Sequence, residues 1–224
     1  MFAKRGAITI FYMIHEILPV GVLQCNCSIL GDETSREAIV VDPGDEIDRI
    51  LAILNRHHLH LQYIVITHGH IDHIGGAKKL KDITGAPVYM NEQDLELYRH
   101  LDWQAAMIGV PVPQTTAIDV LLKEGDEIRC GDIQATVMHT PGHTQGSICL
   151  LIPDSAPTKL LAGDTLFRDS IGRTDLPGGS FDQIMGSLKE KLLALDDSTI
   201  VVPGHGPLTS IGRERERNPF LQSL

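Results

Sequence analysis

The segment from Thr67 to His73, Thr-His-Gly-His-Ile-Asp-His, constrains this chain more than any other feature. It places three imidazoles and one carboxylate within six residues. It directly follows the apolar run Tyr63 to Ile66, whose branched side chains predict a buried strand. The cluster is therefore expected on a loop at the C-terminal end of a strand, where ligands and catalytic groups collect in layered α/β proteins. Packing alone does not explain four potential metal ligands so close together.

The composition predicts one folded domain and excludes some partners. A chain of 224 residues with 42% hydrophobic content suits a single domain or one large two-layer sandwich. We expect residues 1–12 to be an N-terminal extension that leads into the first strand of a domain over 1–224. The net charge of −10 argues against a nucleic-acid partner, which needs a basic face. One local cation could still hold a small anionic substrate.

The cysteines and the N-terminus favour a cytoplasmic protein. The four cysteines include the closely spaced Cys25 and Cys27, a spacing that does not favour a disulfide, so we expect buried free thiols in a reducing compartment. No apolar run approaches the roughly 20 residues needed to cross a bilayer, so no membrane association is expected. Lys4 and Arg5 precede a short apolar run, but no small-residue cleavage site follows it.

Strand patterns alternate with helical patterns along the whole chain. The expected strands are 38–41, 63–66, 87–90, a short strand between 126 and 131, 133–138, 148–152, 159–162 and 198–202. The expected helices lie within 47–54, up to Ile83, over 92–100 with Asn91 as a cap, and from a capping box at Ser180 to Leu193. Residues 101–117, which include Trp103, resist assignment. They form either a lid or pocket wall, or an ordinary packed loop.

Polar groups follow several of these strands, and together they make a metal-ligand set. The candidate ligands are His68, His70, Asp72, His73, His143, Asp164 and His205. A single zinc ion with an open site takes about three protein ligands. Seven are too many for one such ion and suit two ions that share a bridging carboxylate. Two ions about 3.5–4 Å apart can hold one hydroxide between them and polarise a carbonyl or phosphoryl oxygen.

The order and spacing of these residues resemble the metallo-β-lactamase superfamily. That family carries His-x-His-x-Asp-His followed by spaced His, Asp and His, and the likeness extends from about Met13 to Leu221. It implies an α/β fold of αββα type: a sandwich of two mixed sheets with helices on the outer faces. It also implies that one metal is held by three imidazoles and the other by two imidazoles and Asp72, with Asp164 as the bridge. The first set is His68, His70 and His143; the second is Asp72, His73 and His205.

Within the superfamily the chain is most similar to glyoxalase II-like hydrolases. The shared segments are Thr140 to Thr144, Ala162 to Phe167 and Gly172 to Asp175, together with the tail from Pro203 to Leu221. The short bacterial hydroxyacylglutathione hydrolases have this layout. The resemblance implies hydrolysis of S-D-lactoylglutathione to D-lactate and glutathione, by attack of a metal-bridging hydroxide that Asp72 orients. The expected cofactors are two divalent ions, with zinc suited to five imidazoles and iron or manganese accepting the same ligands.

The chain departs from the longer glyoxalase II enzymes where they bind glutathione. Those enzymes have a C-terminal helical domain with basic residues, and this sequence ends before such a domain. Their Lys and Tyr after the bridging Asp are Arg173 and Asp175 here, and Gly206 and Pro207 stand where a Tyr follows the last ligand. Arg173 either meets a substrate carboxylate or forms a salt bridge with Asp175. We expect a monomer or a small homo-oligomer.

Three alternatives remain beside a thioester hydrolase with a small glutathione-linked substrate. A persulfide dioxygenase has the same first motif but uses one iron ion, and its last motif tends to read Pro-Ala-His-Asp rather than Pro-Gly-His-Gly. A lactonase or β-lactamase is the second alternative, although a β-lactamase needs a secretion signal. A metal-binding module without catalysis is the third.

Overall fold

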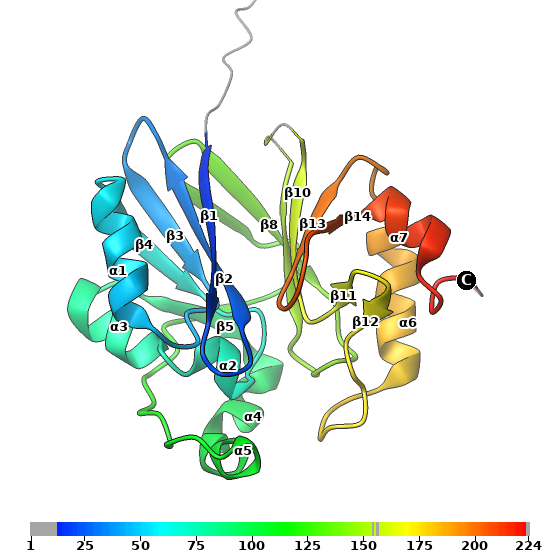
Figure 1. Ribbon diagram of the computed structural model, residues 1–224, viewed down its shortest axis with the longest axis horizontal. Helices are drawn as coiled ribbons and strands as arrows, with labels where there is room; N and C mark the ends of the chain where they lie inside the picture. Colours follow the sequence, from blue (N-terminus) through cyan, green and yellow to red (C-terminus); the bar gives the residue numbers. More distant parts are fainter. Residues whose placement is uncertain (1–12, 154, 156, 223–224) are drawn as a thin grey trace, which may run out of the picture.

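Two mixed sheets form the centre of the structure, and helices cover their outer faces (Figure 1). The computed structural model describes residues 13–153, 155 and 157–222. The predicted αββα sandwich is confirmed. The extension predicted over 1–12 lies outside the described residues, and a single domain over 1–224 stays a prediction.

The first sheet has six strands in the order β1-β2-β3-β4-β5-β6. Its first three strands pair antiparallel, and the pairs from β3 to β6 are parallel. The strands are β1 (Met13–Val20), β2 (Cys25–Asp32), β3 (Glu37–Val41), β4 (His60–Val65), β5 (Val88–Asn91) and β6 (Val120–Leu122).

The second sheet has six strands in the order β14-β13-β10-β9-β8-β7, with β10 and β13 as the parallel pair. A separate two-stranded hairpin, β11 with β12, follows β10. The strands are β7 (Glu127–Cys130), β8 (Ile133–His139), β9 (Ile148–Ile152), β10 (Lys159–Gly163), β11 (Leu166–Phe167), β12 (Ser170–Ile171), β13 (Ile200–Pro203) and β14 (Thr209–Ser210).

Helices lie in three places (Figure 1). Helices α1 (Ile47–Arg56) and α3 (Ala77–Thr84) cover the first sheet, and α6 (Phe181–Glu190) and α7 (Ile211–Arg217) cover the second. The short helices α2 (Ile71–Ile74), α4 (Leu95–Arg99) and α5 (Leu101–Ile108) gather at one end of the sandwich, and 3₁₀ turns lie at Glu92–Asp94 and Leu192–Ala194. None of the helices in the described part of the chain is long and apolar enough to span a bilayer.

The helix boundaries differ from the predicted ones in two regions. The helix expected over 92–100 is a 3₁₀ turn followed by α4, and the unassigned stretch after it contains α5. The helix expected to reach Leu193 ends at Glu190. Its predicted cap is present, because the Ser180 hydroxyl accepts the Gln183 N–H at 3.4 Å.

Strand β3 shows how the sandwich is held together. Successive side chains of a strand point to opposite faces. Ala38 and Val40 pack under α1 and α3, whereas Ile39 and Val41 pack in the core between the sheets. Both faces of this strand are covered, so its sequence is a continuous apolar run rather than an alternating one.

The candidate ligand loops all leave the sheets at the same end of the sandwich. They follow β4 in the first sheet, and β8, β10 and β13 in the second. Backbone hydrogen bonds tie the two sheets together at this end. The Ile148 N–H donates to the Thr67 carbonyl at 2.9 Å, and the Asn26 N–H donates to the Gly204 carbonyl at 2.7 Å.

A histidine remote from this end should make the fold sensitive to acid. His15 on β1 lies 3.1 Å from the Ser28 hydroxyl, and burial and then Lys159 lower its pKa to about 4. The unfolded chain, with an ordinary histidine pKa, therefore takes up the proton first, and stability is lost as the pH falls from about 6.5 towards 4. At pH 5 this one group should cost about 2 kcal/mol.

Urea unfolding of the wild type and His15→Gln at pH 7.5 and pH 5, at equal metal content, measures this effect. We expect the variant to lose about 2 kcal/mol less between the two pH values. His60→Gln, which replaces an exposed histidine, is the control and should behave as the wild type. An equal loss in all three proteins would contradict the assignment to His15.

Candidate metal centre

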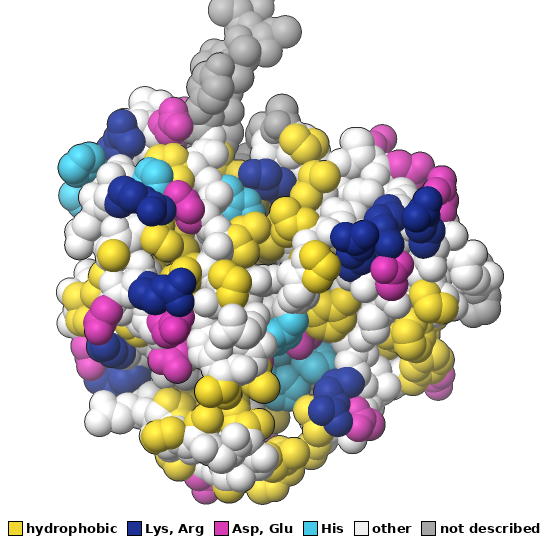
Figure 2. Space-filling view, viewed as in Figure 1, with side chains coloured by type: hydrophobic (Ala, Val, Ile, Leu, Met, Phe, Trp, Pro, Cys, Tyr) yellow, Lys and Arg dark blue, Asp and Glu magenta, His cyan; other side chains and the backbone are white. Residues whose placement is uncertain are grey.

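The structure brings all seven predicted ligand side chains together. They come from four loops and one helix: His68 and His70 after β4, Asp72 and His73 on α2, His143 after β8, Asp164 after β10, and His205 after β13. Figure 2 shows histidine side chains at the bottom of a hollow between the two halves of the molecule.

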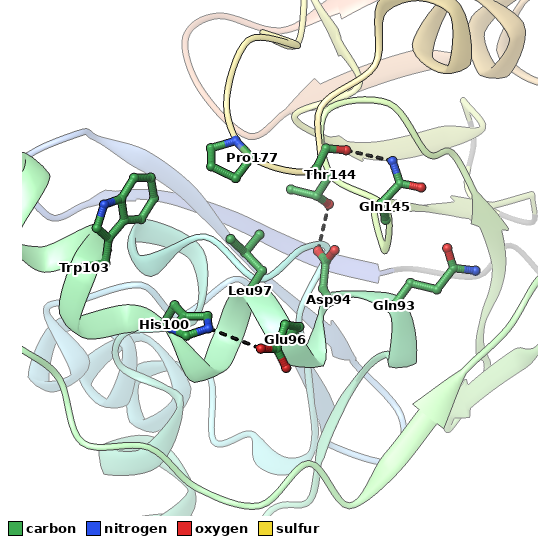
Figure 3. A pocket seen from close by; sticks show the side chains of 10 residues that line it. Gln93, Asp94, Glu96, Leu97, His100, Trp103, Thr144, Gln145 and Pro177 are labelled. Carbon is green, nitrogen blue, oxygen red and sulfur yellow. Dashed lines mark hydrogen bonds and ion pairs between the residues drawn. The ribbon is translucent and has the colours of Figure 1, made fainter.

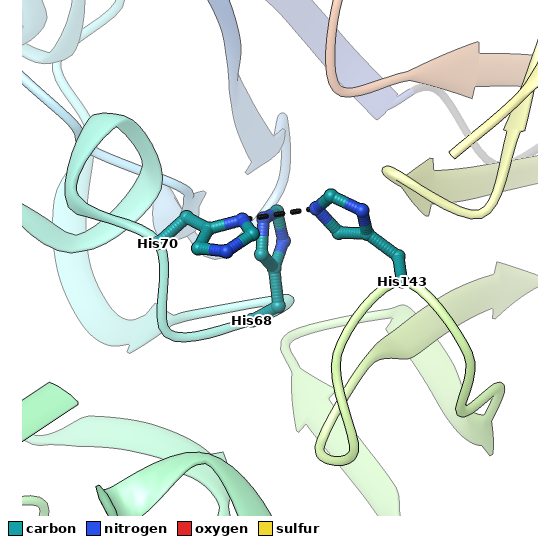
Figure 4. A group of neighbouring side chains, drawn as sticks. All are labelled: His68, His70 and His143. Atoms are coloured by element: carbon teal, nitrogen blue, oxygen red, sulfur yellow. Dashed lines mark hydrogen bonds between the residues drawn. The ribbon is translucent and has the colours of Figure 1, made fainter. Parts of the chain in front are cut away.

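Three imidazoles make the first group (Figure 4). His68, His70 and His143 offer ligand atoms that all lie within 4.8 Å of one another. Nδ1 of His70 is 2.9 Å from Nε2 of His143, so their lone pairs converge on the same point. His68 is completely buried, and its ring stands edge-on to the other two.

One carboxylate and two imidazoles make the second group. Asp72, His73 and His205 also offer atoms within 4.8 Å of one another. Nε2 of His205 lies 3.1 Å from Oδ2 of Asp72 and 3.2 Å from Nε2 of His73. This group takes residues from both halves of the sandwich.

Asp164 lies between the two groups. Its Oδ2 is 3.5 Å from Nε2 of His143 in the first group and 3.7 Å from Nε2 of His205 in the second. Its Oδ1 is 3.5 Å from Nε2 of His73. A single carboxylate therefore reaches both groups, which is the position expected of a bridging ligand.

The sequence reasoning missed Asp42, which orients one imidazole of each group. Its carboxylate accepts the Thr67 N–H at 2.7 Å, the Thr67 hydroxyl at 2.6 Å and Nδ1 of His73 at 2.9 Å. The Thr67 oxygen is in turn 3.1 Å from Nδ1 of His68. Since Nδ1 is occupied in both rings, Nε2 is the atom left to bind a metal. Asp42 directly follows β3, as the ligands follow their strands, and this was the signal available in the sequence.

Backbone carbonyls orient two further imidazoles. Nδ1 of His143 lies 2.8 Å from the carbonyl oxygen of Arg173, and Nδ1 of His205 lies 3.0 Å from that of Leu23. These contacts again leave Nε2 free to face the centre.

Two buried atoms of the centre suit a bound cation. Nε2 of His68 and Oδ1 of Asp164 have no hydrogen-bond partner, although buried polar atoms nearly always have one. Burial and then His73 hold the pKa of His68 well below its ordinary value. Burial and then His143 lower the pKa of His70 to about 3. Neutral imidazole is the form that binds metals, so the donor set fits divalent ions.

The second group favours positive charge. Burial opposes ionisation of Asp72, but His73 and the hydrogen bond from His205 outweigh it and hold the pKa of this carboxyl well below its ordinary value. Burial likewise opposes protonation of His73, but the surrounding carboxylates of Asp72, Asp164 and Asp42 outweigh it and raise its pKa. A cation placed among these groups meets the same favourable field.

Asp94 is a second residue that the sequence reasoning missed. It is buried, and its Oδ2 accepts the Gly69 N–H at 2.8 Å and the Thr144 hydroxyl at 2.7 Å. Its Oδ1 accepts the Gly146 N–H at 2.6 Å. It therefore ties the loop of His68 and His70 to the loop of His143. These are tertiary contacts between distant segments, and no local sequence pattern predicts them.

Close backbone approach explains two of the glycines beside the ligands. A Cβ on Gly204 would lie 2.1 Å from Oδ1 of Asp164. Gly163 has a left-handed φ of +46°, and a Cβ there would lie 2.7 Å from the Thr67 hydroxyl. Gly204 does not have a positive φ, so it is needed for space rather than for its backbone conformation.

The cysteines are not part of the two ligand groups. All four are free and buried, as expected. Cys25 lies 3.5 Å from Nδ1 of His73, but that nitrogen already contacts Asp42. Burial raises the pKa of the Cys25 thiol to about 12, so it stays protonated at neutral pH.

A cavity of about 380 Å³ opens onto the centre and has mostly apolar walls. The apolar wall residues are Leu23, Ile71, Trp103, Met107, Ile108 and Leu176. Three of these come from α5, so the stretch that resisted assignment forms a pocket wall. The side chain of Arg173 also lines the cavity, and it makes two hydrogen bonds to Asp175 at 2.8 and 2.7 Å.

Comparisons with known proteins agree with this fold. Residues 20–205 match the metallo-beta-lactamase superfamily. The chain is 45% identical to an uncharacterised protein of Aquifex aeolicus, over 95% of this chain and 99% of that one. It is 37% identical to hydroxyacylglutathione hydrolase GloC of Haemophilus influenzae, over 93% of this chain and 98% of that one.

Two solved structures are also similar. The BLEG-1 B3 metallo-beta-lactamase superposes with a TM-score of 0.86 at 36% identity, over 93% of this chain and all (100%) of that one. TTHA1623, in a di-iron-bound form, superposes with a TM-score of 0.83 at 37% identity, over 92% and 100% of the two chains.

Replacing Asp94 should weaken one metal site more than the other. In Asp94→Asn an amide NH₂ faces at least one backbone N–H of the ligand loops, so the first group loses its alignment. We expect a roughly 10–100-fold loss of affinity for one of two metal ions. Competition with a chromophoric chelator measures this, with Glu96→Gln, an exposed carboxylate two residues away, as the control. An equal loss of affinity for both ions would contradict the assignment of Asp94 to the first group.

Proposed function

Because the chain belongs to the metallo-beta-lactamase superfamily, we propose that it is a metal-dependent hydrolase that cleaves thioesters of the hydroxyacylglutathione type. The seven converging side chains would hold two divalent ions, one in each group, with Asp164 between them. Zinc suits the five imidazoles, and iron is the main alternative.

The observation that supports this substrate class is that, among the described residues, the cavity holds the candidate ligands but no further acidic side chain that could protonate a leaving group. Apart from the ligand groups, its polar side chains are Gln104 and Arg173. The side-chain amide of Gln104 donates to the Gly69 and Leu97 carbonyls, and its oxygen accepts the Ile71 N–H. An amine or alkoxide leaving group needs a proton, whereas a thiol has a pKa of about 8.5 and leaves as the thiolate near neutral pH. The cavity therefore suits thioesters best.

The residues of the chain divide the work of such a reaction. Bound divalent ions would supply a Lewis acid for the carbonyl oxygen and would lower the pKa of water. Asp72 lies at the cavity with its carboxylate ionised, and we assign it the orientation of the attacking water and the acceptance of its proton. Water then adds to the carbonyl carbon, the C–S bond breaks, and the sulfur leaves with the electron pair. The products are a carboxylic acid and a thiol.

The relative named hydroxyacylglutathione hydrolase supports S-D-lactoylglutathione as the first substrate to test. Recognition of the glutathione carboxylates would rest on Arg173, the one Lys or Arg among the described residues that line the cavity. Its guanidinium is exposed and already paired with Asp175, so we assign it a modest contribution.

Metal analysis together with two assays tests this proposal. We expect about two ions per chain, release of glutathione from S-D-lactoylglutathione, and no oxygen uptake with glutathione persulfide. One iron per chain with oxygen uptake would support the persulfide dioxygenase alternative instead. Turnover of a lactone or β-lactam with no thioester cleavage would overturn the thioester assignment.

Replacing Asp72 should abolish most of the turnover while the fold remains. For Asp72→Ala, reloaded with metal, we expect kcat to fall by about 10²–10⁴-fold, because the variant loses both a ligand and the proton acceptor. Circular dichroism checks the fold. Asp102→Ala, an exposed carboxylate on α5, is the control and should keep its activity. Full turnover in metal-loaded Asp72→Ala would remove Asp72 from the mechanism.

A further inference from the structure

A second cavity, of about 470 Å³, adjoins the cavity of the metal centre (Figure 3). The two share Trp103 as a wall residue. They also draw on neighbouring residues of the same loops: Leu176 lines the first and Pro177 the second, and His143 lines the first and Thr144 the second. The two cavities therefore lie next to each other at Trp103.

The second cavity offers apolar surface on one side. Leu97 of α4, Trp103 of α5 and Pro177 lie around it in Figure 3. Trp103 is 45% exposed, and it lines both cavities. The indole gives a flat surface on which an acyl chain or an aromatic ring can pack.

Most of the polar groups of this cavity are already engaged, and the side chain of Gln93 is exposed. Both oxygens of Asp94 accept hydrogen bonds from the ligand loops. Glu96 is paired with Arg99 and His100. The amide nitrogen of Gln145 donates to the Gly178 carbonyl and to Gln183, each at 2.7 Å. None of the described residues that line the cavity is a Lys or Arg, and its two acidic side chains would repel a carboxylate.

We propose that this cavity is a subsite for an uncharged, apolar substituent of the substrate. A group of this kind covers the indole and Leu97 without burying an unpaired charge, whereas a carboxylate placed here would lose its water and find no cation. The proposal rests on the thioester function proposed above and adds selectivity to it. Thioesters with an apolar acyl or thiol substituent should be better substrates than those whose substituent carries a carboxylate at this position.

Trp103 is the sole tryptophan of the chain, so its fluorescence reports binding in either of the two cavities that it lines. Leu97 lines the second cavity and not the first, so a variant at Leu97 assigns the binding to the second. The probes are two thioethers that cannot be hydrolysed, S-benzyl-N-acetylcysteamine and its 4-carboxybenzyl analogue. We expect the benzyl compound to change the Trp103 emission and to bind at least about tenfold more tightly than the carboxylate. Calorimetry gives the same affinities without fluorescence.

Two variants and one control make the test specific. Leu97→Lys places a cation in the cavity and should reverse the preference, so that the carboxylate binds more tightly. Trp103→Ala, followed by calorimetry, should lose about tenfold in affinity for the benzyl compound. Phe181→Ala removes another half-exposed aromatic side chain, on α6 and outside both cavities, and should change nothing.

The outcomes separate this inference from the proposed function. Equal binding of the two probes, or an unchanged preference in Leu97→Lys, overturns the subsite even if thioesters are hydrolysed. Selective binding of the benzyl probe supports the subsite even if no thioester is cleaved, in which case the thioester function fails alone.

Discussion

The Asp42 carboxylate is the interaction on which the centre depends. It accepts hydrogen bonds from the Thr67 backbone, the Thr67 hydroxyl and His73. Asp42 itself has a left-handed φ of 55°, which turns the chain at the end of β3 so that the carboxylate faces the loop after β4. These contacts join two neighbouring strands of the first sheet and set the donor atom of one imidazole in each ligand group. Removing one partner of this buried carboxylate would leave a polar group unpaired, which lowers the stability of the fold.

The chemistry of the site depends on how charge is distributed over the two ligand groups. Three carboxylates surround His73, while burial and the neighbouring imidazoles lower the pKa of His68 and His70 in the first group and keep them neutral. The protein therefore keeps negative charge on one side of the centre and uncharged donors on the other. The cavity above is apolar, so a substrate carbonyl that enters it meets this field with little water to screen it.

The fold and the positions of the ligands were predictable because both depend on local patterns. Apolar runs mark strands that are buried on both faces, and polar groups at strand ends must lie at one edge of a sheet. The supporting residues were not predictable in this way. Asp94 acts through contacts with segments 25 to 52 residues away. Helix α5 buries Leu101 and Ala105 but also exposes Trp103 and Met107, so its apolar residues do not mark one face. Helix α7 buries Ile211 and Glu214 and is otherwise polar.

Two wall residues of the cavity hold ligands through their main chain. The carbonyls of Arg173 and Leu23 orient His143 and His205, and both residues also line the cavity. A backbone carbonyl is the same whatever the side chain. Mutation at these two positions can therefore change which molecules are accepted and leave the ligand geometry in place. This separation lets one catalytic centre acquire new specificities by single substitutions, without first passing through an inactive form.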